Sequence, residues 1–441
     1  MRTERESVDT PGPFRQFFSL ERDVLVLSLA MFAFSLGFQM TSRFLPDYLV
    51  YLGAGGFVVG LFATLGNVIG AVYPYYGGIV SDRVGSRYAL TVFGFLSTFG
   101  FAIWLASAYV PAIDLGVVTV EPWAWVFVGL LLAQCWKSFG IGGHYAIVKQ
   151  ATDPSRLARG FASTETFRRT AFLIAPLIVA ALVADELVPG FLWVLAIAIV
   201  FAVLGTIVQH LLYEAKADSV GEEFEGIGQI ADDLRALPDP LRPLLVADAF
   251  VRFANGMVYA FFILVITQLL EIGLTLSTPV VGTIDLSPAA FFGVLLGVEM
   301  VVALVTMAPM AAVAERVGLK PVVGLGFFVY AIFPVLLIFG PQYVGNETWL
   351  LVALFAFSGL RFAGLPAHKA LVVGPAERGA GGRVTGTYYL IRGAIVIPSG
   401  AIGGFLWEFA TPELSFTIAT IVGMLGVAYF AAFGQEFEAY R

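Results

Sequence analysis

The chain has 441 residues, of which 59% are hydrophobic and 13% are charged, and its formal net charge is −7. Soluble globular proteins carry about 25% charged residues, so this composition excludes a soluble domain. The single cysteine, Cys135, excludes an intrachain disulfide. The three histidines form no metal-ligand cluster and no nucleophile–base constellation is evident, so we expect neither an enzyme nor a cofactor.

Apolar stretches recur along the whole chain, and each is long enough to cross ~30 Å of hydrocarbon. The runs are continuous and not alternating, so they predict helices, one of the two structures that satisfy the backbone in lipid. A polar stretch at 214–243 divides six predicted spans from six. In chain order the spans are 24–50, 57–80, 88–110, 123–149, 159–184, 188–213, 244–271, 289–313, 321–340, 348–373, 384–409 and 412–434.

Basic residues lie on one side of the predicted membrane. They occupy the N-terminal segment and the even-numbered loops, whereas the odd-numbered loops hold none. Lys and Arg favour cytoplasmic loops, so both termini are expected to be cytoplasmic. No signal peptide is evident before residue 24. The predicted organisation is a cytoplasmic segment 1–22, a six-helix bundle 23–213, a cytoplasmic linker 214–243, a second six-helix bundle 244–434 and a cytoplasmic tail 435–441.

The two halves repeat each other in register. Internal repeats of membrane helices are a common design of secondary transporters, in which the two repeats rock around a site near the midplane. We therefore predict an all-α membrane protein with two pseudo-symmetric bundles. The equally spaced pairs are Gly60 to Asp82 with Gly293 to Glu315, Lys137 to His144 with Arg361 to His368, and Arg159 to Arg168 with Arg383 to Arg392.

The segment 77–87, GGIVSDRVGSR, resembles the G-x-x-x-D-R-x-G-R-[RK] signature of the major facilitator superfamily, which lies in the loop between helices 2 and 3. Ser86 replaces one basic residue of this signature. The second copy, 311–320, has Ala311 for the first Gly and Glu315 for the Asp. The resemblance implies a twelve-helix transporter in the plasma membrane. The matching residues are Gly78, Asp82, Arg83, Gly85 and Arg87.

In that family the Asp of the signature meets the start of helix 11 and closes the cytoplasmic side. A carboxylate at the C-terminus of its own helix is disfavoured by ~0.3–1 kcal/mol, which makes sense if another helix or an Arg receives Asp82. The alternative is that the basic residues only set topology, but topology needs neither Asp nor Gly. The expected cytoplasmic gate comprises Gly78, Asp82, Arg83, Gly85, Arg87, Glu315, Arg316 and Arg168.

Three ionisable residues, Lys137, Glu299 and Arg361, fall near the middle of predicted spans. Each charge at a helix centre costs ~2.5–3.5 kcal/mol if it faces lipid, so these groups are expected to face a wet cavity or one another. Lys137 and Arg361 occupy repeat-related positions and would approach the pseudo-twofold axis from opposite halves. Two cations facing one cavity suit an anion, either a substrate carboxylate or phosphate or Glu299 itself, and Arg392 could add a third positive charge. Paired structural charges are the alternative.

Glu299 is the best candidate for proton coupling, because a lone acid in mid-membrane can gain and lose a proton as its surroundings change. His144 and His368 are further candidates, although a packing role is equally open. Arg43 with Asp47, and Asp248 with Arg252, are spaced i,i+4 and are expected to form intramembrane ion pairs on one helix face.

The sequence therefore predicts a monomeric secondary active transporter in the lipid bilayer, with a small organic anion as the favoured substrate and H⁺ (or Na⁺) as coupling ion. We expect no nucleic-acid partner. Proton-coupled efflux of hydrophobic or amphipathic compounds is the alternative within this class. A membrane receptor or a lipid scramblase is the alternative outside it, but neither needs paired mid-membrane charges at repeat positions.

Overall fold

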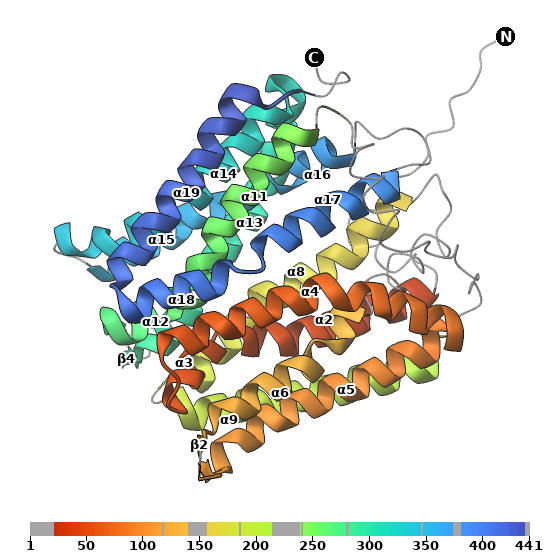
Figure 1. Cartoon of the computed structure of the whole chain (residues 1–441), viewed down its shortest axis with the longest axis vertical. Coiled ribbons are helices and arrows are strands. Elements are labelled where there is room, and N and C mark those ends of the chain that lie inside the picture. Colours follow the sequence, from red (N-terminus) through yellow and green to blue (C-terminus); the bar gives the residue numbers. More distant parts are fainter. Residues whose placement is uncertain are drawn as a thin grey trace.

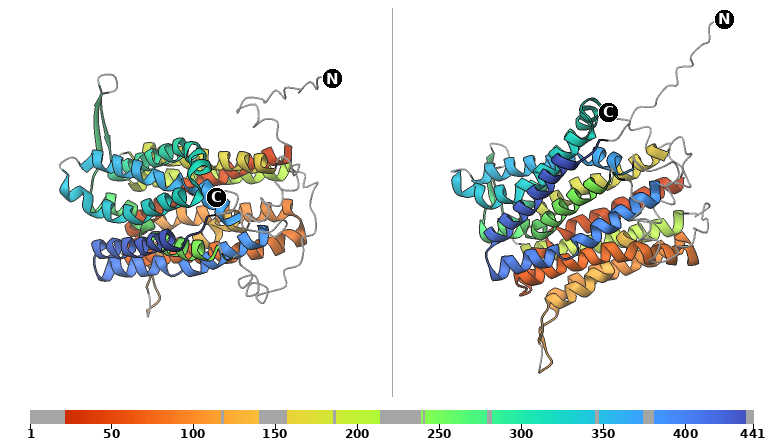
Figure 2. Two further views of the ribbon diagram at one scale, coloured as in Figure 1. Left: turned by 90° about the horizontal axis from the view of Figure 1, so that it is seen from above. Right: turned by 45° about the horizontal axis from the view of Figure 1, so that its top comes forward.

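The structure is a computed structural model. It describes residues 22–116, 119–139, 157–184, 187–213, 239, 241–278, 282–344, 347–373 and 381–436. The chain is mostly helical, as the continuous apolar runs predict, and the helices lie side by side along one direction (Figures 1 and 2).

The described connections of the first half include short turns and one small hairpin. In chain order the elements are α2 (Arg22–Ser42), α3 (Leu45–Tyr51), α4 (Gly56–Val84), α5 (Ser86–Ala106), the 3-10 turn η1 (Ser107–Tyr109), β1 (Ile113–Asp114), β2 (Thr119–Val120), α6 (Trp123–Ala133), the π-helical η2 (Cys135–Phe139), α8 (Leu157–Leu182) and α9 (Leu187–Leu212).

The second half has more interruptions within its helices. Its elements are α11 (Leu241–Val258), the 3-10 turn η4 (Tyr259–Phe261), α12 (Phe262–Leu264), the π-helical η5 (Val265–Leu269), β3 (Leu274–Thr278), β4 (Gly282–Leu286), α13 (Pro288–Val317), α14 (Leu319–Phe339), the 3-10 turn η6 (Gly340–Tyr343), α15 (Glu347–Gly359), the 3-10 turn η7 (Leu360–Phe362), α16 (Leu365–Val373), α17 (Gly381–Val396), α18 (Ser399–Phe409) and α19 (Pro412–Phe433).

The described residues include eight helices that are long and apolar enough to cross a membrane. Two further apolar segments, Leu29–Ser42 and Thr170–Leu182, are shorter. The predicted spans 123–149 and 159–184 border or enter residues 140–156, which lie outside the described part. The spans 24–50 and 348–373 are interrupted, the first between α2 and α3 and the second at η7. The count of twelve spans and the cytoplasmic position of the termini therefore stay predictions.

Helices pack mainly with helices of their own half. In the first half α2 lies against α8 and α9, and in the second half α11 and α14 lie against α19. The halves meet where α4 packs on α18 and where α8 packs on α13 (Figure 1). Most of the predicted linker 214–243 lies outside the described residues, so the predicted domain boundaries remain expectations.

Two left-handed glycines make the tight turns that join paired helices in the two halves. Gly85 (φ 85°) links α4 to α5, and Gly318 (φ 93°) links α13 to α14. A side chain at either position would strain the backbone, which explains why glycine stands there. The two glycines have the same interval as Gly60 and Gly293, so the repeat read in the sequence has a counterpart in the backbone.

Two antiparallel hairpins mark one end of the molecule, which we call the hairpin end. In β1–β2, Ile113 pairs with Val120, and in β3–β4, Leu274 pairs with Leu286. The start of α4 and the end of α18 lie at this same end (Figure 1).

The halves are in close contact near the hairpin end. A Cβ added at Gly60 of α4 would stand 2.4 Å from the carbonyl oxygen of Gly400 and 2.7 Å from the Cα of Gly404, so only glycine permits this approach. The Thr64 hydroxyl accepts the N–H of Ala401 at 2.7 Å. On the other seam the Ser287 hydroxyl donates to the carbonyl of Val183 at 2.7 Å. These contacts close the molecule across the two halves at this end.

Candidate functional site

The charged residues that the sequence places in mid-membrane lie where regular α-helix is interrupted. Arg43 follows the end of α2, Lys137 lies in the π-helical η2, and Arg361 lies in the 3-10 turn η7. Tyr259 begins another 3-10 turn, η4. Interrupted helices expose backbone and redirect side chains, and they are frequent at functional sites.

Arg361 and Glu299 form a buried ion pair in the second half. The Arg361 Nη2 lies 2.6 Å from Glu299 Oε1, and the Ser358 hydroxyl donates to the same oxygen at 2.5 Å. Their side chains are 1% and 5% exposed. Aromatic rings surround the guanidinium group, with its Cζ 5.0 Å from the Tyr330 ring centre. Such a pair loses several kcal/mol of hydration, so it is retained only with good geometry, which this contact has.

Arg43 brings a second guanidinium group to the same place from the first half. Its Cζ lies 4.0 Å from the centre of the Tyr259 ring, and Arg361 Cζ lies 5.9 Å from the same centre. Both guanidinium groups therefore lie near the same tyrosine ring. We call Arg43, Tyr259, Glu299, Ser358 and Arg361 the central cluster.

The expected ion pair between Arg43 and Asp47 is wrong. The i,i+4 argument requires one continuous helix, but α2 ends at Ser42 and α3 begins at Leu45. Asp47 instead accepts a hydrogen bond from the Gln268 amide at 2.8 Å, across the two halves. Pro46 at the start of α3 is the signal in the sequence that could have indicated this break.

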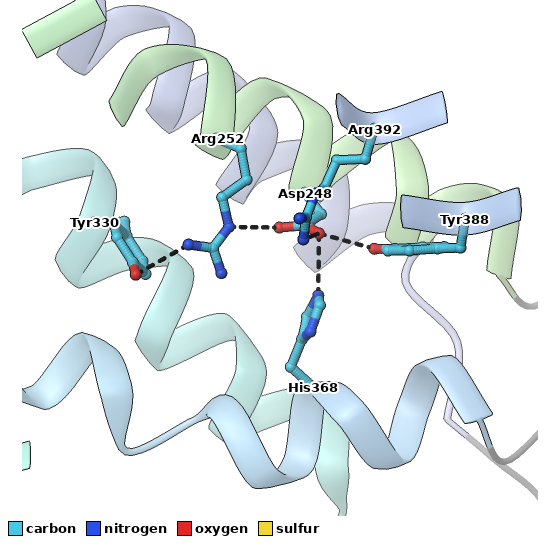
Figure 3. Close-up of polar contacts among 6 residues, drawn as sticks. All are labelled: Asp248, Arg252, Tyr330, His368, Tyr388 and Arg392. Atoms are coloured by element: carbon cyan, nitrogen blue, oxygen red, sulfur yellow. Dashed lines mark hydrogen bonds and ion pairs between the residues drawn. The ribbon is translucent and has the colours of Figure 1, made fainter. Parts of the chain in front are cut away.

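Asp248 is the centre of a second charged group, the inner cluster (Figure 3). This carboxylate is fully buried. Its Oδ1 pairs with Arg252 Nε at 3.2 Å, so the predicted pair of Asp248 and Arg252 is present in the structure. Its Oδ2 is approached by three groups from α16 and α17: His368 Nε2 at 3.2 Å, the Tyr388 hydroxyl at 3.1 Å and Arg392 Nη1 at 3.2 Å.

The inner cluster changes the expected roles of two residues. Arg392 does not join Arg361 around a shared anion, because its guanidinium is bound to Asp248. His368 does not stand alone in apolar packing, since it faces that same carboxylate. Tyr330 links the two clusters: its hydroxyl accepts from Arg252 Nη1 at 3.0 Å, and its ring lies beside Arg361.

Two cavities lie next to these groups. One of about 10 Å³ is bounded by Arg252, Tyr330, Arg361 and His368, so it lies between the central and inner clusters. The other, of about 40 Å³, lies in the first half and contains Lys137 in its wall. Lys137 and Arg361 therefore line different ones of these two cavities. The first-half cation that meets Arg361 is Arg43.

The structure describes only some residues of the predicted gate. Arg87 Nε donates to the carbonyl of His210 at 2.7 Å, near the C-terminus of α9, where a cation is favoured. Arg316 is exposed in the last turn of α13. His144 lies outside the described residues, as do the side chains of the remaining predicted gate positions, Gly78, Asp82, Arg83, Arg168 and Glu315.

Comparison with known proteins finds similarity to proteins that are described as transporters. A Methanocaldococcus jannaschii protein described as an uncharacterized MFS-type transporter is 22% identical over 408 residues, which cover 92% of this chain and 93% of that protein. No family model matches the chain.

Solved structures show the same fold at low sequence identity. The nucleoside transporter NupG superposes with a TM-score of 0.70 at 14% identity, covering 93% of this chain and all of that one. The peptide transporter POT in complex with alafosfalin gives 0.69 at 16% identity, with 96% and 98% covered. A POT family transporter in complex with 5-aminolevulinic acid gives 0.70 at 12% identity, with 95% and 100% covered.

Proposed function

We propose that the chain is a plasma-membrane transporter of the major facilitator type, as its similarity to an MFS-type transporter and to transporters of the same fold supports, and that it moves a small organic anion by alternating access coupled to protons. The two halves would rock against each other around the central cluster. Proteins with this fold have been crystallised with small molecules such as 5-aminolevulinic acid, which supports a small solute.

The observation that carries the proposal is an excess of buried positive charge in the central cluster. The cluster contains two cations, Arg43 and Arg361, and a single carboxylate, Glu299, which pairs with Arg361. Arg43 Nη2 and Arg361 Nε are buried and have no hydrogen-bond partner among the described residues. Buried guanidinium nitrogens are normally satisfied, because an unpaired one costs free energy. A substrate carboxylate or phosphate would supply the missing acceptors.

Competition for Arg361 provides a coupling mechanism. While Glu299 is ionised it holds Arg361 at 2.6 Å, so an incoming anion must displace it. Protonation of Glu299 removes this competitor and leaves the guanidinium for the substrate. Anion and proton therefore bind together, and releasing the proton on the other side expels the anion. Glu299 is the coupling residue in this proposal.

The inner cluster and the gate complete the proposed cycle. His368 beside Asp248 is a second place where a proton can reside, and a small cavity of about 10 Å³ lies between it and Arg361. His144 keeps its proposed role in proton handling, and Asp82 its role in the cytoplasmic latch. If the termini are cytoplasmic, contact at the hairpin end means that this state is closed to the outside.

Uptake into proteoliposomes with an imposed pH gradient tests the proposal. A panel of radiolabelled carboxylates and organic phosphates should reveal at least one anion whose uptake follows the gradient. We expect Arg361→Lys and Arg43→Gln to reduce this uptake at least about 10-fold, since a charge-assisted hydrogen bond is worth ~1.5–3 kcal/mol. Glu299→Gln should permit exchange but abolish its dependence on the gradient. Lys320→Ala, at the start of α14, is the control.

Normal gradient-driven anion uptake in the Arg43 and Arg361 variants would contradict the proposal, because both cations would then be structural. Thermal unfolding of each purified variant separates lost transport from lost folding.

Efflux of hydrophobic or amphipathic compounds remains the second candidate, because the first-half cavity beside Lys137 is lined largely by aromatic side chains. Proton-driven export of a lipophilic cationic dye, with no response to any anion, would favour it.

A further inference from the structure

Asp47 is a buried acid that the proposed cycle does not use. It lies in α3 near the hairpin end and is 6% exposed. Its Oδ1 accepts a hydrogen bond from Gln268 Nε2 at 2.8 Å. Gln268 belongs to η5 of the second half, and α3 also packs on α12 of that half. The burial of Asp47 therefore depends on contact between the two halves.

No ion pair compensates the charge of Asp47 among the described residues. Arg43, four residues earlier, is directed to the Tyr259 ring instead. The Gln268 amide that Asp47 contacts is neutral. An ionised Asp47 would therefore be buried without a counter-charge.

The neighbouring elements do not supply that counter-charge either. The elements packed against α3 include α2, α4, α9 and α12, and of the described residues α4 and α9 bring no acidic or basic side chain to this end. Two further acids lie at the hairpin end, and a second negative charge does not stabilise a carboxylate. The ionisable groups on or next to these elements are Tyr48 and Tyr51 in α3, Arg43 after α2, Tyr259 before α12, Glu271 after η5 and Glu408 in α18.

Burial favours the protonated form of such an acid. An ionised carboxylate loses its hydration on burial, and one hydrogen bond from an amide replaces only part of it. The neutral acid loses far less and still accepts the N–H of Gln268. When the halves separate, water reaches the carboxyl group, and a hydrated Asp is ionised at neutral pH.

We propose that Asp47 is a proton-binding site that is occupied while the halves are in contact at the hairpin end. One proton binds as the halves close there and leaves as they separate. Glu299 governs anion binding in the proposed cycle, whereas Asp47 governs closure. This inference rests on the proposed alternating access and adds a second proton site to it. If the termini are cytoplasmic, this proton comes from the outside medium, and an acidic exterior favours closure.

Pulsed electron paramagnetic resonance on the transporter in nanodiscs tests the inference. Spin labels at Tyr109→Cys and Tyr343→Cys, with Cys135→Ser, report the distance between the halves, since the two tyrosines are 73% and 83% exposed at the hairpin end. The parent protein for all variants carries Glu408→Gln, because ionised Glu408 favours contact and its titration would have the opposite sign. In this parent the ratio of separated to closed molecules should rise with pH, by up to about 10-fold per pH unit for one linked proton.

Variants of the parent locate the effect. Asp47→Asn keeps an acceptor for Gln268 but cannot ionise, so the ratio should become independent of pH and the halves should stay in contact in alkaline buffer. The matched control is Asp285→Asn, at an exposed acid of β4 at the same end, which should retain the pH dependence. Thermal unfolding confirms that each variant is folded.

Infrared spectroscopy gives an independent measurement of the proton. The C=O band of protonated carboxylic acids at neutral pH should be weaker in Asp47→Asn than in the parent, and unchanged in Asp285→Asn. An equally strong band in Asp47→Asn would mean that Asp47 is ionised in the closed state and would overturn the inference.

A pH dependence that survives in Asp47→Asn, a ratio that falls as the pH rises in the parent, or a ratio that does not change with pH would also overturn the inference. The direction of the change in the parent is decisive even if Asp47→Asn does not fold. If the halves separate without regard to pH while anion uptake follows the pH gradient, alternating access stands and only the role of Asp47 falls. If the halves never separate, in the wild type or in any variant, the proposed function falls as well.

Discussion

Glu408 joins the two halves at the hairpin end by capping a helix of the other half. Its carboxylate accepts the backbone N–H of Gly56, the first residue of α4, while Glu408 itself lies in the last turn of α18. A carboxylate is disfavoured at the C-terminus of its own helix and favoured at the N-terminus of another. The N-terminus of α4 therefore stabilises the Glu408 carboxylate only while the two halves are in contact at the hairpin end.

The contact between Glu408 and Gly56 sets the free energy that is lost when the halves separate. A hydrogen bond to a charged group contributes ~1.5–3 kcal/mol, and solvent exposure of Glu408 reduces that value. We take about 1–2 kcal/mol for the closed arrangement, which corresponds to roughly 5- to 30-fold in the equilibrium between closed and separated ends. Glu408→Gln removes the charge and keeps the shape, so it should move the equilibrium toward separation.

Pulsed electron paramagnetic resonance measures that equilibrium. Labels at Tyr109→Cys and Tyr343→Cys, which are 73% and 83% exposed in opposite halves, report the distance across the hairpin end once Cys135 is replaced. The population of separated molecules should rise in Glu408→Gln. The control is Glu413→Gln, an acid in the first turn of α19. An unchanged distance distribution in both Glu408→Gln and Glu408→Ala would refute the reasoning and leave closure to glycine packing alone.

Three further outcomes are expected. Arg361→Ala should lower the stability to thermal unfolding by about 3–5 kcal/mol, because it leaves Glu299 buried and unpaired. The double variant Arg361→Ala, Glu299→Ala should recover part of this loss, and no recovery would argue against coupling of the pair. Gly60→Val should abolish transport, because its Cβ meets backbone at 2.4 Å, whereas Gly70→Val, with nothing within 4 Å, should be tolerated in the same uptake assay. Asp248→Asn should reduce thermal stability by roughly 3 kcal/mol, since it leaves three basic groups without their shared carboxylate; an unchanged melting temperature would contradict that role.

Much of the architecture follows from sequence alone because the bilayer permits few solutions. Continuous apolar runs must become helices in lipid, and the described helices follow those runs. The equal spacing of Gly60 and Gly293 likewise anticipated the paired turns at Gly85 and Gly318. The requirement that Glu299 and Arg361 avoid lipid also followed from the cost of an intramembrane charge.

The partners of those charges were decided by tertiary structure. Spacing along one helix predicts contacts only while that helix continues, and the break after Ser42 directed Arg43 to the other half and Asp47 to Gln268. Repeat symmetry placed Lys137 and Arg361 at equivalent positions, but their interrupted helices direct them to different cavities. Contacts between the halves depend on how α4 packs against α18 and α8 against α13. Short-range sequence patterns do not determine how helices from different halves are placed against one another.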